Sequence, residues 1–195
     1  MTGSPAALPY LLDTNILLAL IRGKDLGTFI DTTYQLSAQS QRPLVCVVSV
    51  GEIWTLAARN CWGALKRAAL ATMLQNVVLV EIFNTPQLIQ AYVDIEIASN
   101  GVAGGAVVMG KNDVWIAAVA KIAPAHLLTT DHDFDHLFGS MIQGTYIDPS
   151  SKLPAAGGGP VAAVPSQPAA QPAAPPPPIQ APAAVPPPPP GPPGS

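Results

Sequence analysis

The stretch LPYLLDTNILLALI, residues 8–21, contains the strongest indication of the fold. Its first five residues are mostly apolar and predict a short buried strand, and the apolar residues 16–21 predict a helix. A single acidic residue, Asp13, lies between them. Alternating strands and helices are typical of an α/β fold with parallel strands, so Asp13 is expected at the carboxyl end of the first strand.

The same alternation continues along the chain. Further strands are expected at residues 44–48, 77–80, 127–130 and 145–147, and helices at 25–39, 49–60, 62–75, 85–100 and 112–123. We expect Asn112 to cap the last of these helices. Parallel strands joined by helices require right-handed crossovers. The sequence therefore predicts an α/β domain over residues 8–148, with a mainly parallel central sheet between two helical layers.

Composition changes after this domain. Residues 151–195 contain 17 of the 23 prolines, one charged residue and no aromatic residue. Such a segment lacks the large apolar side chains that would offset the entropy of ordering. We therefore predict a disordered proline-rich tail at 149–195 and a short flexible leader at 1–7. The proline runs at 175–178 and 186–190 are either polyproline ligands for a partner or part of a spacer.

Charge and hydropathy limit the class of protein. Residues 1–150 hold all 12 acidic residues and all but one of the 9 basic residues, so their net charge of −4 excludes a general basic coat for nucleic acid. No uncharged apolar stretch reaches the about 20 residues of a membrane helix, and no basic residue precedes Arg22 as in a signal peptide. Cys46 and Cys61 lack a metal-ligand spacing. We expect a cytoplasmic protein that has reduced thiols and no membrane contact.

Four acidic residues are expected at the carboxyl edge of the sheet. Asp13 and Asp131 directly follow strands, Glu52 lies about one helical turn after the second strand, and Asp113 begins the helix before the fourth. Two carboxylates about 4 Å apart repel by about 4 kcal/mol at an effective dielectric constant near 20, so such a cluster requires protons or a cation. Ligation by oxygen alone favours Mg²⁺ or Mn²⁺ over zinc.

Each acid also has a structural explanation. Asp13 is suited to cap its helix, and Ser49 with Glu52 matches the S-x-x-E capping box. Asp113 complements a helix N-terminus, and Asp131 can cap the turn that follows it. The placement of all four acids in this order of elements favours a shared metal site.

Four segments together resemble the PIN-domain ribonucleases, and most closely the VapC-type toxins of type II toxin-antitoxin systems. The segments are LLDTNIL (residues 11–17), VSVGEIW (48–54), NDVWIAA (112–118) and LLTTDHDF (127–134). None is specific alone, but all four occur in order. The resemblance covers residues 8–148, and segment 101–110 departs from it by being longer and more apolar.

The resemblance implies an RNA-cleaving hydrolase that depends on Mg²⁺ or Mn²⁺ and leaves 5′-phosphate and 3′-hydroxyl ends. It also implies a homodimer and a cognate antitoxin. For the dimer we expect exposed apolar surfaces on helices 25–39 and 62–75. The residues implied are the catalytic and metal-binding quartet Asp13, Glu52, Asp113 and Asp131, a further metal ligand Asp133, Asn15 to orient Asp13, and Thr130 beside the metal.

Other functions remain open from the sequence. A PIN-like scaffold that binds partners through its polyproline tail would need no cleavage, and a housekeeping RNA-processing nuclease would need no antitoxin. His132 and His136 are four residues apart, a spacing that also occurs in zinc sites on helices.

Overall fold

The computed structural model describes residues 8–39, 41–83, 85–102 and 105–154. The predicted leader at 1–7 and the predicted tail beyond residue 154 lie outside the described residues. The strands are β1 (Tyr10–Leu12), β2 (Leu44–Cys46), β3 (Val78–Val80), β4 (His126–Thr129) and β5 (Gln143–Tyr146). The helices are α1 (Thr14–Arg22), α2 (Asp25–Tyr34), α3 (Val47–Arg59), α4 (Ala64–Gln75), α5 (Pro86–Asn100), α6 (Lys111–Ile122) and the 3₁₀ helix η1 (His132–Leu137).

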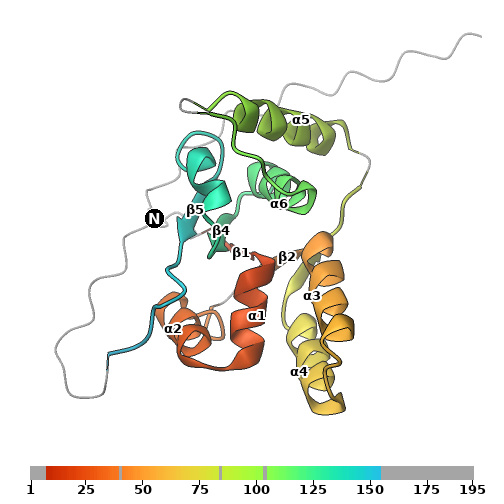
Figure 1. Cartoon of the computed structure of the whole chain (residues 1–195), viewed down its shortest axis with the longest axis vertical. Helices are drawn as coiled ribbons and strands as arrows, with labels where there is room; N and C mark the ends of the chain where they lie inside the picture. The colour runs from red at the N-terminus through yellow and green to blue at the C-terminus, as the bar shows by residue number, and fades with distance from the viewer. Residues whose placement is uncertain (1–7, 40, 84, 103–104, 155–195) are drawn as a thin grey trace, which may run out of the picture. The chain divides into compact units, whose positions relative to one another are not determined.

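The five strands form one sheet in the order β3-β2-β1-β4-β5, and every neighbouring pair is parallel. Figure 1 labels four of these strands, in the order β2, β1, β4 and β5. Leu12 at the end of β1 lies opposite Val45 of β2 and Leu128 of β4. The carboxyl ends of these three strands are therefore nearly level. The predicted α/β class with a parallel sheet is confirmed.

Helices cover both faces of the sheet, because the apolar side chains of its strands alternate in direction. Leu11 and Leu127 pack with α5, α6 and η1 on one face. Leu12 and Leu128 pack with α1, α2, α3 and α4 on the other. All four leucines are at most 1 % exposed, and burying each contributes about 1.5–3 kcal/mol relative to leaving it in water.

The predicted strand at 44–48 is too long. β2 ends at Cys46, and Val47 already begins α3. Consequently Ser49 is the third residue of α3 rather than its cap, and the predicted capping box with Glu52 does not form. The run of β-branched residues favours a strand locally, but Val48 instead packs from the first helical turn against the core beneath α5 and α6.

Other predicted boundaries also differ, including those of two helices. The helix expected at 25–39 ends at Tyr34 because Gln35 adopts a left-handed conformation with φ 51°. In the following turn, the amide and hydroxyl groups of Ser37 both donate to Asp31 Oδ1. The helix expected to be capped by Asn112 begins at Lys111, and Gly110, two residues before Asn112, occupies its cap position.

The exposed apolar side chains are not where the sequence places them. Leu65 of α4 is the only exposed large apolar residue on the two helices predicted for the dimer surface, whereas α5 exposes Ile89, Val93 and Ile97. The predicted surfaces on helices 25–39 and 62–75 are therefore wrong, because those helices bury their apolar residues within the domain. Within the described ranges, no helix has the length and hydropathy needed to cross a bilayer.

Candidate metal-binding site

Asp13 occupies the first position after β1, where its side chain is 3 % exposed. It is the N-cap of α1, and its Oδ1 accepts a hydrogen bond from the Thr14 amide. Its Oδ2 accepts a hydrogen bond of 2.8 Å from the Thr129 hydroxyl at the end of β4. The predicted capping role is thus confirmed, and the same contacts fix Asp13 at the carboxyl edge of the sheet.

Glu52 reaches the same place from the second turn of α3. The Thr14 hydroxyl donates to its Oε2, and the Asn112 amide donates to its Oε1 at 2.7 Å. Thr14 therefore contacts both Asp13 and Glu52. Asn112, predicted only as a cap, instead joins α6 to α3.

Asp113 lies in the first turn of α6, as predicted. A methyl group added at Gly110 would lie 2.6 Å from Asp113 Oδ2, so the carboxylate folds back closely over the start of its helix. A larger residue at position 110 would require the Asp113 carboxylate to move from this position.

Asp131 and Asp133 lie on the turn after β4. Asp131 caps η1 by accepting a hydrogen bond from the Asp133 amide, and its own amide donates to the Thr129 hydroxyl. The predicted capping role of Asp131 is confirmed. Because Thr129 also donates to Asp13, a single hydroxyl links the ends of β1 and β4.

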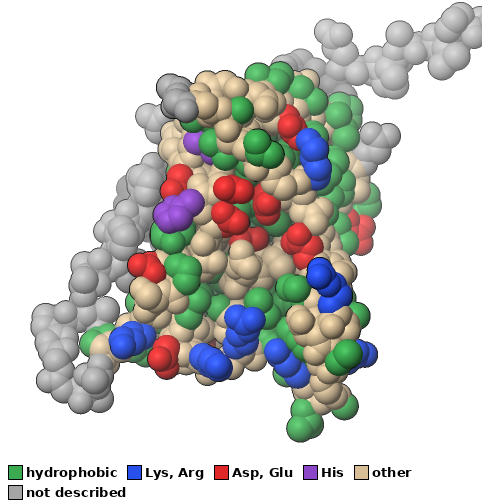
Figure 2. Space-filling view, in the orientation of Figure 1, with side chains coloured by type: hydrophobic (Ala, Val, Ile, Leu, Met, Phe, Trp, Pro, Cys, Tyr) green, Lys and Arg blue, Asp and Glu red, His purple; other side chains and the backbone are tan. Residues whose placement is uncertain are grey.

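Three of the four predicted acids line one cavity of 640 Å³. Figure 2 shows acidic side chains gathered near the centre of this face, whereas most basic side chains lie lower, over the layer formed by α1–α4. The described residues that line the cavity are Asp13, Thr14, Asn15, Val48, Gly51, Glu52, Thr55, Leu56, Arg59, Asn112 and Asp113.

Burial and neighbouring charges raise the pKa values of Asp13 and Asp113 in this cluster. The pKa of Asp13 is raised to about 6, mainly by burial and also by the nearby carboxylates Glu52 and Asp131, against the hydrogen bonds from Thr129 and Thr14 that lower it. Burial also raises the pKa of Asp113 to about 7, together with the negative charges of Asp13, Glu52, Asp131 and Asp133. The other four predicted acids thus lie near enough to Asp113 for their charges to raise its pKa.

The chemistry of this donor set fits a hard divalent cation, because every acidic donor is a carboxylate oxygen and the cluster carries uncompensated negative charge. In the described residues, however, no three acidic, histidine or cysteine side chains are gathered closely enough to hold one ion. Instead, the carboxylate oxygens of Asp13 and Glu52 accept hydrogen bonds from the side chains of Thr14, Asn112 and Thr129. Metal binding at this site would require some of these side chains to rotate.

The predicted supporting residues lie near the site but make different contacts. Asn15 is exposed on the cavity wall, and the hydrogen bonds that hold Asp13 come from Thr14 and Thr129. Thr130 is half-buried, and its neighbour Thr129 contacts Asp13. The strand register is the signal that identifies Thr129, because Leu12 pairs with Leu128 and the next residues, Asp13 and Thr129, then lie side by side.

The two histidines considered for zinc have separate partners. His132 Nδ1 contacts Asp135 Oδ2, and its ring stacks on Tyr146. His136 Nε2 lies 2.9 Å from the hydroxyl of Ser99 in α5. The structure therefore gives no support to a shared zinc site.

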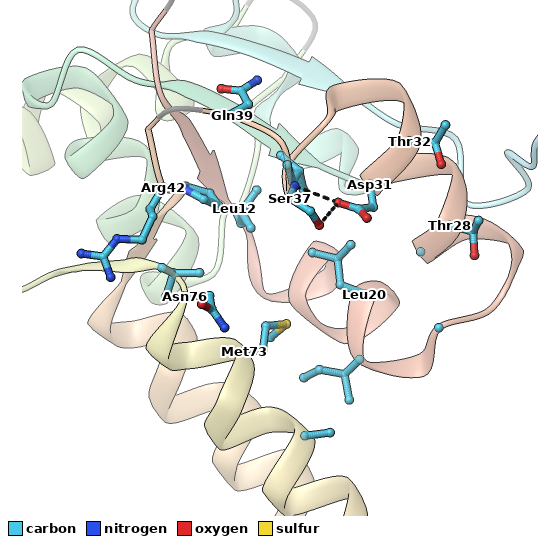
Figure 3. Close-up of a pocket in the computed structure, with 17 residues that line it drawn as sticks. Leu12, Leu20, Thr28, Asp31, Thr32, Ser37, Gln39, Arg42, Met73 and Asn76 are labelled. Atoms are coloured by element: carbon cyan, nitrogen blue, oxygen red, sulfur yellow. Dashed lines mark hydrogen bonds between the residues drawn. The ribbon is translucent and has the colours of Figure 1, made fainter.

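A second, larger cavity of 700 Å³ opens elsewhere, among α1, α2, α4 and the segment that follows α2 (Figure 3). Its charged side chains are Asp31 and Arg42, and its walls include Leu12, Leu20 and Met73. Both contacts from Ser37 end on Asp31, as the dashed lines in Figure 3 show. None of the predicted catalytic acids lies in it.

Comparison with known proteins agrees with this arrangement. The sequence model of the PIN domain family matches residues 10–138, a range that includes all five predicted acids. The chain belongs to the PIN domain family. No curated protein sequence matches this PIN domain.

Solved structures similar to this PIN domain include VapC toxins of VapBC toxin-antitoxin complexes. VapBC-1 from nontypeable Haemophilus influenzae has a TM-score of 0.56 at 20 % identity, covering 71 % of this chain and 98 % of that chain. VapBC2 from Rickettsia felis, bound to a DNA fragment from its promoter, has a TM-score of 0.55 at 15 % identity, and the match again covers 71 % of this chain and 98 % of that chain. DNA-bound VapBC from Salmonella typhimurium has a TM-score of 0.50 at 18 % identity, covering 72 % and 98 %.

Proposed function

We propose that this PIN domain is a ribonuclease that uses Mg²⁺ or Mn²⁺ held by Asp13, Glu52, Asp113 and Asp131, with Asp133 as a further ligand. One observation carries the proposal. Carboxylates from the residue after β1, from α3 and from α6 line one cavity, and burial and repulsion raise the pKa of Asp113 to about 7. Such a cluster destabilises the apo protein at neutral pH, and a divalent cation would relieve that cost.

The side chains have distinct parts in this function. Asp13 is held rigidly by Thr14 and Thr129 and is suited to define the centre of the site. To hold the cation, Glu52 would give up its contacts with Thr14 and Asn112, and both polar groups would then be free to face the substrate. The bound cation would lower the pKa of a water molecule and offset the negative charge that builds on the phosphate.

An antitoxin partner is the second part of the proposal. The similar structures are VapBC complexes, in which a toxin of this fold is bound by its antitoxin. Expression of this chain alone should slow bacterial growth, and expression of the Asp13→Asn form should not. Equal toxicity of both forms would contradict the nuclease explanation. A neighbouring reading frame for a small DNA-binding protein would support the pairing and also a toxin rather than a housekeeping role.

The decisive test separates metal binding from helix capping. Melting temperatures are measured with and without Mn²⁺ for the wild type and for Asp113→Asn, with Asp25→Asn as the control. Asp25 lies in the first turn of α2, outside the cavity. The proposal requires that Mn²⁺ stabilises the wild type and the control but not Asp113→Asn, and that only Asp113→Asn stops cleaving single-stranded RNA. An unchanged Mn²⁺ shift in Asp113→Asn would favour the capping explanation and a scaffold function.

A further inference from the structure

The cavity that contains the acids also contains one basic side chain, Arg59. It is the last residue of α3, the helix that carries Glu52. Of the cavity-lining residues that the structure describes, Arg59 alone is basic. A cation in a cavity built from carboxylates requires a physical explanation.

Arg59 shares a helix face with Glu52. The two are seven residues apart, which is two turns of helix and about 10 Å along its axis. Thr55 and Leu56, one turn from each, line the same wall. The Thr55 hydroxyl donates its hydrogen to the Gly51 carbonyl. The Arg59 guanidinium is therefore the group on this side of the cavity that can donate hydrogen bonds to a ligand.

Arg59 forms no ion pair with any residue that the structure describes. By contrast, Lys111 pairs with Glu96 and Lys121 pairs with Asp94. No comparable pair or hydrogen bond joins the Arg59 side chain to another described residue, and the side chain is exposed. Its guanidinium is therefore available to an outside anion.

We propose that Arg59 binds a phosphate of the RNA strand next to the phosphate that is cleaved, and so positions single-stranded RNA across the acidic cavity. This inference rests on the proposed nuclease function. A substrate that approaches a cluster of carboxylates needs a compensating positive charge, and the planar guanidinium can donate two hydrogen bonds to one phosphate. Because phosphates carry no sequence information, Arg59 contributes affinity and strand position rather than sequence preference.

The chain offers a matched control in Arg22. Both arginines are exposed and end a helix, Arg22 in α1 and Arg59 in α3, so each has the same favourable interaction with a helix C-terminus. Arg22 does not line the cavity. Replacing either residue with alanine removes the same charge and the same helix-end stabilisation, but only Arg59→Ala removes the phosphate contact.

The first experiment measures cleavage of a mixed-sequence single-stranded RNA oligonucleotide in Mn²⁺. For Arg59→Ala we expect KM to rise about tenfold with kcat within about twofold of wild type, and Arg59→Lys to recover part of the loss. We also expect the slope of log affinity against log salt to fall by about 0.7 for the one lost phosphate contact. Arg22→Ala should match the wild type, and all these variants should keep the wild-type melting shift with Mn²⁺. Equal KM values for Arg59→Ala and Arg22→Ala would overturn the proposal.

A second measurement keeps this test separate from the nuclease proposal. Binding of the same RNA in Mn²⁺ is measured for Asp113→Asn with and without the added Arg59→Ala change. Weaker RNA binding by the double variant would support the role of Arg59, whether or not the wild type cleaves RNA. Absence of cleavage by the wild type would contradict the nuclease proposal but not the role of Arg59. Equal binding by both forms would overturn the role of Arg59 alone.

Discussion

The two cavities of this domain differ in how their charges are compensated. In the larger cavity, Asp31 accepts two hydrogen bonds from Ser37, and these contacts stabilise the turn that ends α2. In the smaller cavity, the pKa of Asp113 is raised to about 7 by burial and by four surrounding acids, with no compensating hydrogen bond contributing. The charge of Asp31 is therefore stabilised by contacts within the fold, whereas the clustered acids at the smaller cavity destabilise the charged form of Asp113. This difference, rather than size, indicates the functional site.

The largest expected effect is on cleavage. Replacing Asp113 with asparagine should lower the rate of Mn²⁺-dependent RNA cleavage by on the order of a hundredfold or more, because a bound metal contributes several kcal/mol of transition-state stabilisation. Asp31→Asn, which changes the acid of the larger cavity, should cleave at the wild-type rate. Initial rates on single-stranded RNA test both variants. Loss of cleavage in Asp31→Asn would mean that the two cavities do not differ in function.

Metal removal should have the next largest effect. Chelation of Mn²⁺ with EDTA should lower the melting temperature of the wild type by several degrees, because a ligand that binds only the folded state stabilises it by mass action. The same treatment should leave Asp113→Asn unchanged. Differential scanning fluorimetry with and without EDTA measures the shift. The same wild-type melting temperature with and without EDTA would contradict the proposed metal site.

Apo stability should fall as the pH rises from about 4 to about 7. The pKa values of Asp13 and Asp113 are raised from 3.8 to about 6 and about 7 in the folded state. In this window the unfolded chain has already lost the protons that the folded chain retains, so each unit of pH favours unfolding. Urea midpoints between pH 4 and 8 in EDTA measure this contribution. Asp113→Asn should show a smaller fall, and an identical pH profile would be evidence against the raised pKa of Asp113.

A smaller effect is expected from Asp31→Ala. It removes the acceptor for both Ser37 contacts and should lower the free energy of unfolding by about 1 kcal/mol, similar to the loss of a helix-end hydrogen bond. The Mn²⁺-induced melting shift should remain that of the wild type. A reduced shift would show that the turn after α2 contributes to the metal site.

The smallest effect is expected from shortening the chain. A protein that ends at Ser150 should keep the melting temperature and the cleavage rate, because residues 151–195 lack aromatic residues and are rich in proline. This comparison tests the predicted domain boundary. A drop in melting temperature would show that the proline-rich segment contributes to the folded domain.

Local sequence determined the class of fold and the positions of the acids along it. Short apolar runs followed by helical periodicity identify the strands and helices, and the carboxyl-edge rule for parallel sheets brings Asp13, Asp113 and Asp131 to one end. The sequence pattern also predicted that Asp13 and Asp131 cap the elements after them, and both do. These properties depend on neighbours in the chain, so residue order alone is sufficient to predict them.

Tertiary structure decided what holds each acid and what lies beside it. Val47 and Val48 join a helix because α3 packs there, although their β-branched side chains favour a strand. The hydroxyl that donates to Asp13 belongs to Thr129 rather than to its neighbour Thr130 because of the register between β1 and β4. Arg59 enters the cavity only because α3 begins at Val47 and ends at the cavity wall. Contacts between residues distant in sequence depend on register and helix packing, and the order of residues leaves both of these open.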